Sequence, residues 1–300
     1  YQVKFADDHS QIPFNFKAKR LTAVWLKHPN SSMPRIFVSE CRVDELPKLK
    51  SLIEPYIGAG VTHKVPNINQ SQQVVDYLHT GKWHVPTYKD YQLMQAESEY
   101  VAWVLYNRYY LNHFTLTVNQ LDSFGFQAEQ LSLIQQYQTA YERVGLDAIQ
   151  SSFLSDLVDL YQQHMIRFNQ FLLENGVVLN EPHGNPLNIS QDGLLLQSSS
   201  KSERVLAKFP DGSYEIPGSY IEFAYRGILP EMAVAVLKKE RTFLSLNGSD
   251  LRDGFEVGNA DKIFESTYLH QAPELLDEPI VSDAFNQSRD RLRFYLDSTR

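Results

Sequence analysis

Strand-like alternation in two separate blocks of the chain, with helical patterns between and within them, most constrains the fold of this sequence. In the first block, Lys19–Leu26 and Arg35–Glu40 alternate polar and apolar residues on either side of a break at Pro29–Pro34. Such alternation is typical of half-buried β-strands. The second block begins with the cleanly alternating run Leu111–Val118, and further strand-like runs follow at 177–179, 193–198, 204–209 and 218–226.

Helical patterns account for much of the remaining chain. Asp44 is placed to cap a helix that runs to Tyr56, and residues 91–110 are typical of one long amphipathic helix rich in aromatics. A further helix is expected over 146–175, with Gly176 at its C-terminal cap, and a short one over 260–268 with Asn259 as its cap. The order of strands and helices predicts an α+β fold.

Composition excludes several classes of function. The chain has 300 residues and a net charge of −8, whereas a nucleic-acid groove normally needs a basic face. Cys41 is the only cysteine, so neither a disulfide nor a cysteine-based zinc or iron–sulfur site can form within the chain. One thiol fits a reducing cytoplasm, which is the predicted location.

The two ends of the sequence carry little targeting information. No run of about 18 apolar residues is present, so a membrane span is not expected. The chain opens at Tyr1 without a charged and then apolar leader, which predicts no secretory signal. Because it lacks an initial Met, we expect it to be processed or to begin inside a domain.

His113 is the histidine best placed to bind a metal. The sequence has nine histidines but no dense metal motif, so a metal site must be assembled from different strands. His113 begins an alternating strand and shares its face with Thr115 and Thr117, a combination unlike a dry core. The plainer interpretation is a surface or hydrogen-bonded histidine, and periodicity alone leaves both open.

Glu222 is the candidate carboxylate ligand. It lies within an otherwise apolar strand, on one face with Tyr220 and Ala224. A carboxylate buried in a sheet is unfavourable unless a metal or a cation compensates it. A solvated glutamate on an exposed strand is the alternative.

Other polar residues nearby have two interpretations as well. Arg226 is either a surface charge or a clamp for a substrate carboxylate, since a guanidinium binds carboxylates through two parallel hydrogen bonds. Gln197 and Ser198 are either strand-edge residues or hydrogen-bond donors to a 2-oxo acid. His183 lies among turn-forming residues and is expected in a loop.

An ordered set of phrases resembles a known family, the 2-oxoadipate dioxygenase/decarboxylases. The resemblance extends from about Phe14 to Gln271. The phrases that carry it are Phe16–Trp25, Pro34–Glu40, Asn112–Val118, Asp192–Ser199, Ile216–Arg226 and Gly258–Thr267.

The resemblance implies a vicinal-oxygen-chelate-like fold, in which paired βαβββ modules form a curved mixed sheet around one metal ion. In these terms the chain is a single catalytic domain with a helical insertion. Its expected parts are a partial first β module over 1–43, the insert over 44–110, a second β module over 111–230 and a C-terminal extension over 231–300.

The resemblance also implies an activity. Family members convert 2-oxoadipate to 2-hydroxyglutarate with release of CO2, a step of lysine breakdown, and use O2 and an Fe(2+) ion held by two His and one Glu. The second His matches His113 and the Glu matches Glu222. Arg226 is then expected to bind the distal carboxylate of the substrate or to support Glu222, with Gln197 and Ser198 as further substrate contacts.

The sequence departs from the family pattern at the first His, which belongs to a His-x-x-x-Arg-Thr strand. No such strand precedes Phe16, and Asp8-His9-Ser10 lacks the Arg-Thr, so we expect the third ligand to lie upstream of Tyr1. Two rival functions remain open: a non-catalytic small-molecule binding protein on the same fold, and a non-oxidative metal-dependent isomerase. Metal analysis separates the first from the enzyme, and oxygen dependence separates the second. The oligomeric state stays unpredicted.

Overall fold

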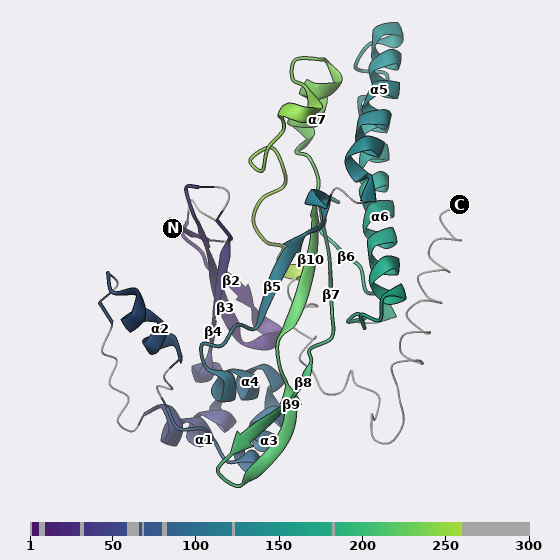
Figure 1. Ribbon diagram of the computed structural model, residues 1–300. Coiled ribbons are helices and arrows are strands. Elements are labelled where there is room, and N and C mark those ends of the chain that lie inside the picture. The colour runs from purple at the N-terminus through teal and green to yellow at the C-terminus, as the bar shows by residue number, and fades with distance from the viewer. Residues whose placement is uncertain are drawn as a thin grey trace. The chain divides into compact units, whose positions relative to one another are not determined.

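The protein is described by a computed structural model that covers residues 2–5, 10–30, 33–58, 66–67, 69–79, 83–121, 124–181 and 184–259. Over these residues the chain divides into two compact units (Figure 1). The first comprises residues 2–113 and 202–220, and the second comprises residues 114–201 and 221–259. His183 and the helix predicted over 260–268 lie outside the described residues.

The first unit contains an antiparallel sheet built around strand β3. The strands are β1 (Gln2–Lys4), β2 (Phe14–Phe16), β3 (Leu21–Lys27) and β4 (Ile36–Cys41). β1, β2 and β4 each pair with β3, and the β3–β4 register runs from Leu21 opposite Cys41 to Leu26 opposite Ile36. Leu21, Ala23 and Trp25 are buried, as the period of two requires when one face of a strand is covered. The alternation at 19–26 and 35–40 therefore predicted two real strands.

Helices and a β-hairpin form a second part of this unit. They are α1 (Pro47–Ile57), α2 (Ser71–His79), α3 (Tyr88–Glu97), α4 (Glu99–Asn107), and the strands β8 (Arg204–Phe209) and β9 (Gly212–Pro217). The hairpin turns at Pro210-Asp211, and Gly212, which pairs with Phe209, follows with a φ of 153°. Its buried side chains join the helices in one core, made of Leu46, Leu49, Ile53, Tyr91, Met94, Val101, Ala102, Leu105, Ala207, Phe209 and Ile216. Residues 204–217, predicted to be part of the second β module, thus belong with the helices of the 44–110 segment.

The prediction of one continuous helix over 91–110 is wrong, because two helices, α3 and α4, occupy this segment. Ser98 has an extended backbone, with φ −155° and ψ 107°, and it ends α3 and begins α4. Its hydroxyl accepts a hydrogen bond from the backbone N–H of Val101 at 3.3 Å, which satisfies one of the open donors at the start of α4. The apolar periodicity continues across the break because both helices pack on the same core. Asp44 is not a helix cap either, because α1 begins at Pro47 after a 3-10 turn at Val43–Glu45.

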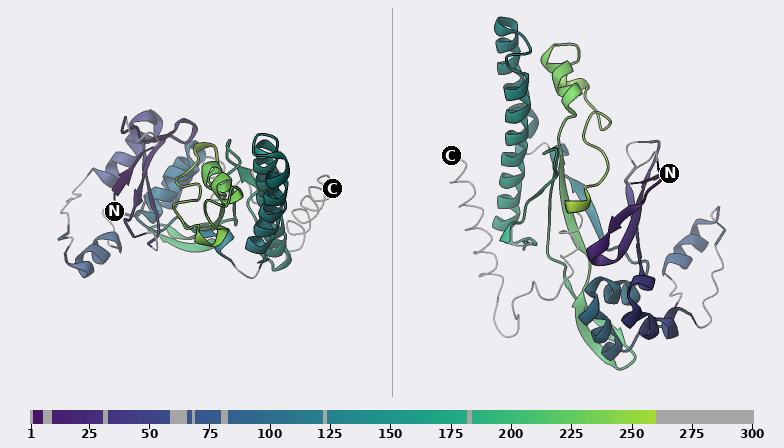
Figure 2. Two further views of the ribbon diagram at one scale, coloured as in Figure 1. Left: turned by 90° about the horizontal axis from the view of Figure 1, so that it is seen from above. Right: turned by 180° about the vertical axis from the view of Figure 1, so that it is seen from behind.

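The second unit combines a sheet with a pair of long helices. Its elements are β5 (His113–Thr117), α5 (Phe126–Val144), α6 (Gln150–Glu174), β6 (Asn188–Ile189), β7 (Leu195–Ser199), β10 (Tyr220–Arg226) and α7 (Pro230–Leu237). The first residues of β5 and β10, His113 and Tyr220, are the exceptions and are assigned to the first unit. The strand order is β5-β10-β7-β6, and β10 pairs antiparallel with β7, with Glu222 opposite Ser199. α5 and α6 lie side by side as antiparallel neighbours in the views of Figures 1 and 2. α5 was missing from the sequence-based expectations, whereas α6 confirms the predicted helix over 146–175.

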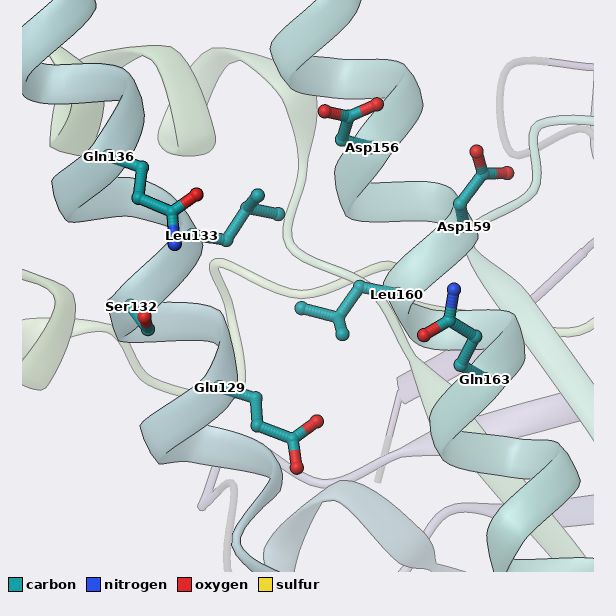
Figure 3. Close-up of a pocket in the computed structure, with 8 residues that line it drawn as sticks. All are labelled: Glu129, Ser132, Leu133, Gln136, Asp156, Asp159, Leu160 and Gln163. Carbon is teal, nitrogen blue, oxygen red and sulfur yellow. The ribbon is translucent and has the colours of Figure 1, made fainter. Parts of the chain in front are cut away.

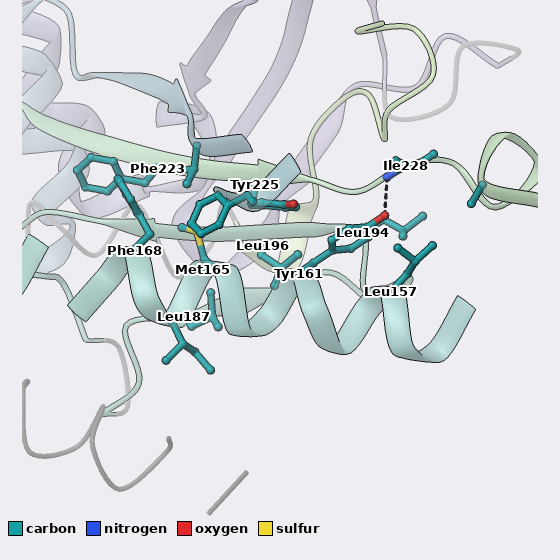
Figure 4. Close-up of a cluster of buried hydrophobic side chains, with 14 of the residues drawn as sticks. Leu157, Tyr161, Met165, Phe168, Leu187, Leu194, Leu196, Phe223, Tyr225 and Ile228 are labelled. Carbon is teal, nitrogen blue, oxygen red and sulfur yellow. Dashed lines mark hydrogen bonds between the residues drawn. The ribbon is translucent and has the colours of Figure 1, made fainter. Parts of the chain in front are cut away.

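The core of this unit lies where α6 packs against β7 and β10 (Figure 4). Phe168 meets Phe223 edge to face at a ring distance of 5.3 Å, and Tyr161 contacts Tyr225 at the same distance. The residues Ile221, Phe223 and Tyr225 therefore form the helix-facing side of β10, and Glu222 points away from α6. α6 ends in a Schellman motif, in which Gly176, at φ 83°, and Val177 donate to the carbonyls of Leu173 and Leu172. The predicted role of Gly176 is confirmed.

The observed architecture is a mixed α+β fold with several sheets, as the order of strands and helices predicts. Of the residues predicted as strand 177–179, only Leu179 pairs, in an isolated bridge with Ser200. Within the described part of the chain, no helix is both long and apolar enough to cross a membrane.

Candidate metal centre

Glu222 is a buried carboxylate on the face of the sheet that points away from α6. Only 3% of the residue is exposed, and the residues next to it along β10 are apolar. The hydroxyl of Thr115 on β5 donates a hydrogen bond to Oε2 at 3.1 Å, and Nε2 of Gln197 on β7 donates to Oε1. Each carboxylate oxygen thus accepts a hydrogen bond from a neutral side chain, and the two bonds fix the orientation of the carboxylate.

Gln197 is buried on the same face of the sheet, since it lies opposite Ala224 in the β7–β10 register. Its Nε2 is bound to Glu222, and its Oε1 accepts a hydrogen bond from Nδ2 of Asn259 at 2.8 Å. Gln197 was predicted to contact a substrate. The structure instead places its amide between two protein side chains.

Ser198 lies on the opposite side of β7. Its hydroxyl donates to Oδ1 of Asn169 on α6 at 2.7 Å, and none of its surface is exposed. Because side chains alternate along a strand, Ser198 faces the helix while Gln197 and Ser199 face the side of Glu222. Ser198 was predicted to donate to a 2-oxo acid, and in this structure its hydroxyl donates to Asn169.

Arg226 shares the face of Glu222 at the far end of β10. It is 7% exposed, and its Nη1 donates to the carbonyls of Arg252 and Gly254, at 2.9 Å in each case. Its backbone N–H and carbonyl are held by the side-chain amide of Asn119, at 3.3 and 3.2 Å. The guanidinium therefore binds the chain segment that follows α7, a contact that the sequence did not predict.

His113 begins β5, as predicted, and belongs to the first unit. Its ring stacks on Tyr220 with a centroid distance of 4.6 Å and an angle of 16°. Its Nδ1 lies 2.9 Å from Oδ1 of Asn112, which can only accept a hydrogen bond. If this nitrogen donates the hydrogen bond, Nε2 is the ring nitrogen left to bind a metal. A histidine that donates from one nitrogen in this way is typical of metal ligands.

An imidazole nitrogen and an oriented carboxylate are the types of group that a two-His, one-carboxylate Fe(II) site takes. His113 belongs to the first unit and Glu222 to the second, and each is described by its own surroundings. Within the described residues, no group of three or more His, Cys, Asp or Glu is placed to bind a metal, so these residues do not supply a complete set.

A cavity of about 420 Å³ lies elsewhere, between α5 and α6 (Figure 3). Its acidic lining residues are Glu129, Asp156 and Asp159. Glu129 is paired with Arg167 at 2.6 Å, and Asp156 accepts a hydrogen bond from the hydroxyl of Tyr137 at 2.6 Å. None of the residues predicted for the metal or the substrate lines this cavity, so it is distinct from the candidate centre.

A buried polar network on the helix side of the sheet was not predicted at all. His164 on α6 has no exposed surface, and its Nδ1 lies 3.0 Å from the hydroxyl of Tyr225, which also accepts from Gln130 at 2.8 Å. Burial lowers the pKa of His164 to about 4, and the hydrogen bond that His164 donates to Glu129 opposes this shift. The sequence carried one signal for this network, a histidine on the apolar stripe of the helix predicted over 146–175.

Comparison with known proteins adds independent information. The sequence profile of the 2-oxoadipate dioxygenase/decarboxylase family matches residues 9–242. Two curated plant relatives carry this name. The chloroplastic/amyloplastic protein of Oryza sativa subsp. japonica is 35% identical over 283 residues, 88% of this chain. The chloroplastic protein of Arabidopsis thaliana is 35% identical over 285 residues, 90% of this chain. The chain spans 64% of the length of each relative.

A solved structure is similar as well. The hydroxyglutarate synthase from Oryza sativa, crystallised in complex with 2-oxoadipate, matches with a TM-score of 0.61 and 35% identity. The match covers 86% of this chain and 71% of that protein. Because the family profile and the curated relatives agree over most of its length, the chain belongs to the 2-oxoadipate dioxygenase/decarboxylase family.

Proposed function

We propose that this chain belongs to an Fe(II)-dependent enzyme that converts 2-oxoadipate and O2 to 2-hydroxyglutarate and CO2. The observation that carries the proposal is the buried carboxylate of Glu222, oriented by the neutral donors Thr115 and Gln197. A carboxylate is one of the three ligands of a two-His, one-carboxylate Fe(II) site, and neutral donors that orient it are typical of the surroundings of such a ligand. Family membership and the 2-oxoadipate complex of the rice protein supply the reaction class.

His113 and Glu222 are the proposed ligands from this chain. When bound, Fe(II) supplies oxygen activation and a template that holds the carboxylate and keto oxygens of a 2-oxo acid. The protein residues do the rest. Asn112 contacts Nδ1 of His113 and so orients the ring, and Thr115 and Gln197 orient the carboxylate of Glu222. The third ligand is expected outside the described residues.

Arg226 has two proposed roles on this face. As a guanidinium close to the end of β10, it is the candidate for binding the distal carboxylate of a dicarboxylic substrate. Its observed contacts with the carbonyls of Arg252 and Gly254 support a second role, in which it holds the segment that covers this end of the sheet. Gln197 and Ser199, rather than Ser198, are the β7 residues on the same side.

The reaction balances without a second oxo acid. One O2 is consumed for each 2-oxoadipate, and its two oxygen atoms are accounted for in CO2 and 2-hydroxyglutarate together. We therefore expect no requirement for added 2-oxoglutarate.

A step of lysine breakdown and a vicinal-oxygen-chelate-like fold belong to the same proposal. In the second unit, the order β5, α5–α6, β6, β7 and β10 supports a βαβββ module. The location in the cytoplasm stays a prediction, and the two plant relatives are named as plastid proteins.

The test measures oxygen uptake by the natural full-length protein with Fe(II) and 2-oxoadipate, together with 2-hydroxyglutarate and CO2. Glu222→Gln should reduce turnover by at least about 100-fold, because the neutral amide removes both the charge and one metal-binding oxygen. Glu215→Gln is the matched control, since Glu215 is an exposed residue of β9 and should keep wild-type turnover. Full turnover by Glu222→Gln would show that the ligand assignment is wrong.

Two other outcomes would favour the rival functions. Bound metal and bound 2-oxoadipate without any turnover would indicate a non-catalytic binding protein. Conversion of substrate under anaerobic conditions, with no CO2 released, would indicate an isomerase.

A further inference from the structure

We propose that Asn259 is a positioning residue that fixes the Glu222 carboxylate for metal binding, acting through the side-chain amide of Gln197. The inference rests on the proposed function, because it concerns the same metal site. Asn259 lies outside residues 9–242, the range matched by the family profile. From the sequence it was expected to cap a helix. The structure places it in a helical stretch that already begins at Val257, and buries it beside β7 with 2% of its surface exposed.

The hydrogen bonds around Asn259 form a chain whose direction is set at one end by the backbone. Nδ2 of Asn259 lies 3.3 Å from the carbonyl oxygen of Leu195 and 2.8 Å from Oε1 of Gln197. A backbone carbonyl can only accept a hydrogen bond, so the group that faces it must be the NH2 of Asn259. The second hydrogen of that NH2 then requires an acceptor, which is the oxygen of Gln197.

This assignment decides which end of Gln197 faces the metal ligand. With its oxygen held by Asn259, Gln197 presents its NH2 to Glu222. If the amide of Gln197 were rotated by half a turn, its oxygen would face the carboxylate and its NH2 would face the NH2 of Asn259. Both contacts would then be repulsive. Asn259 therefore selects the one orientation of Gln197 that stabilises a charged Glu222.

The segment that carries Asn259 is fixed by contacts that do not involve its side chain. Leu251 bridges to Ile228, and the backbone N–H of Arg252 donates to the carbonyl of Gly227 at 2.8 Å. The guanidinium of Arg252 bonds Asp192 at 3.1 Å. These anchors, together with the contacts of Arg226, hold the segment in place when Asn259 is changed. A substitution at Asn259 is therefore expected to change the orientation of Gln197 and to leave these anchoring contacts in place.

The experiment measures the affinity of the natural full-length protein for Co(II), an oxygen-stable probe of the Fe(II) site, and the visible spectrum of bound Co(II). Asn259→Ala should weaken Co(II) binding by about 10-fold or more, as loss of an outer hydrogen-bond partner commonly does. It should also shift the Co(II) absorption bands. Asn259→Asp should weaken binding further. Its carboxylate would attract the NH2 of Gln197 and turn the oxygen of Gln197 toward Glu222.

A double-mutant cycle separates this route from a general loss of structure. Gln197→Met removes the amide at similar volume, so adding Asn259→Ala to it should weaken Co(II) binding no further. Val257→Ala, at a half-exposed position of the same segment, is the control and should keep wild-type affinity and spectrum. Thermal unfolding of each variant checks that the fold is retained. The isosteric Asn259→Asp serves as the second variant if Asn259→Ala fails to fold.

Three results would overturn the inference. Wild-type affinity and an unchanged Co(II) spectrum in both Asn259 variants would show that Asn259 has no influence on the site. Additive losses in the double mutant would show that Asn259 acts by a route other than Gln197. If the wild-type protein binds no Co(II) or Fe(II), the metal site and the proposed function fail together. If the wild type binds the metal and both Asn259 variants bind it equally well, this inference is refuted while the proposed function stands.

Discussion

His164 has no exposed surface, and acidification must charge it against the packing that surrounds it. In its neutral form every contact is satisfied, because Tyr225 donates its hydroxyl hydrogen to Nδ1 and Nε2–H donates to Glu129 at 3.1 Å. A second proton would sit on Nδ1, facing an oxygen that already accepts from Gln130. The stacked ring of Phe126, at 4.3 Å, offers no compensating acceptor.

The magnitude follows from the pKa of His164 in the two states. Burial lowers that pKa from 6.5 to about 4 in the folded protein, although Glu129 opposes the shift. Between these values the unfolded chain binds a proton that the folded chain does not. Stability is therefore fully present above pH 6.5 and is lost as the pH falls toward 4. Between pH 7 and pH 5 the loss is about 2 kcal/mol, and its limit at lower pH is about 3 kcal/mol.

The assay is urea unfolding at pH 7, 6 and 5, followed by the circular dichroism of the helices. Tryptophan fluorescence is unsuitable, because Trp25, Trp83 and Trp103 all belong to the first unit and His164 to the second. The variant His164→Gln keeps a polar side chain but has no titrating group. Between pH 7 and pH 5, the free energy of unfolding of the wild type should fall by about 2 kcal/mol more than that of His164→Gln. His84→Gln, at an exposed histidine, is the control and should follow the wild type.

Parallel pH profiles for the wild type and His164→Gln would refute the reasoning. They would mean that His164 is already hydrated or charged in the folded protein. Unequal profiles that separate only below pH 4.5 would point to Glu129 instead. Its pKa is lowered mainly by the hydrogen bond from Arg167, so its contribution is lost only at more acidic pH.

Two further predictions concern stability. Gly227→Ala should destabilise the second unit by about 1–3 kcal/mol, since a Cβ there would lie 2.6 Å from the ring of Tyr161, and unchanged urea unfolding would show that the ring moves aside freely. Ser98→Ala removes the side-chain acceptor for the N–H of Val101 and should destabilise the first unit by about 1 kcal/mol. Tryptophan fluorescence during urea unfolding measures this loss, and Ser98→Asp, which restores a capping oxygen, should recover most of it.

The periodicity of apolar residues predicted those strands and helices that have one face buried along their whole length. The alternation in β3 and the apolar stripe of α6 were both visible because one face of each element is buried from end to end. Gly176 was recognisable because an αL backbone after a helix favours glycine. The break at Ser98 was not, because the apolar pattern continues through it. Only the cap geometry shows that two helices meet there.

The sequence by itself determined the α+β class, the strands that carry His113 and Glu222, and the family to which the chain belongs. Those conclusions depend on periodicity and on residue identity, which are properties of short segments. Only the tertiary structure decided that Gln197 and Asn259 serve Glu222, and that Ser198 faces α6. The physical reason is that a hydrogen-bond partner across a sheet is set by register. A shift of one residue exchanges the two faces of a strand, and no local pattern in the sequence encodes it.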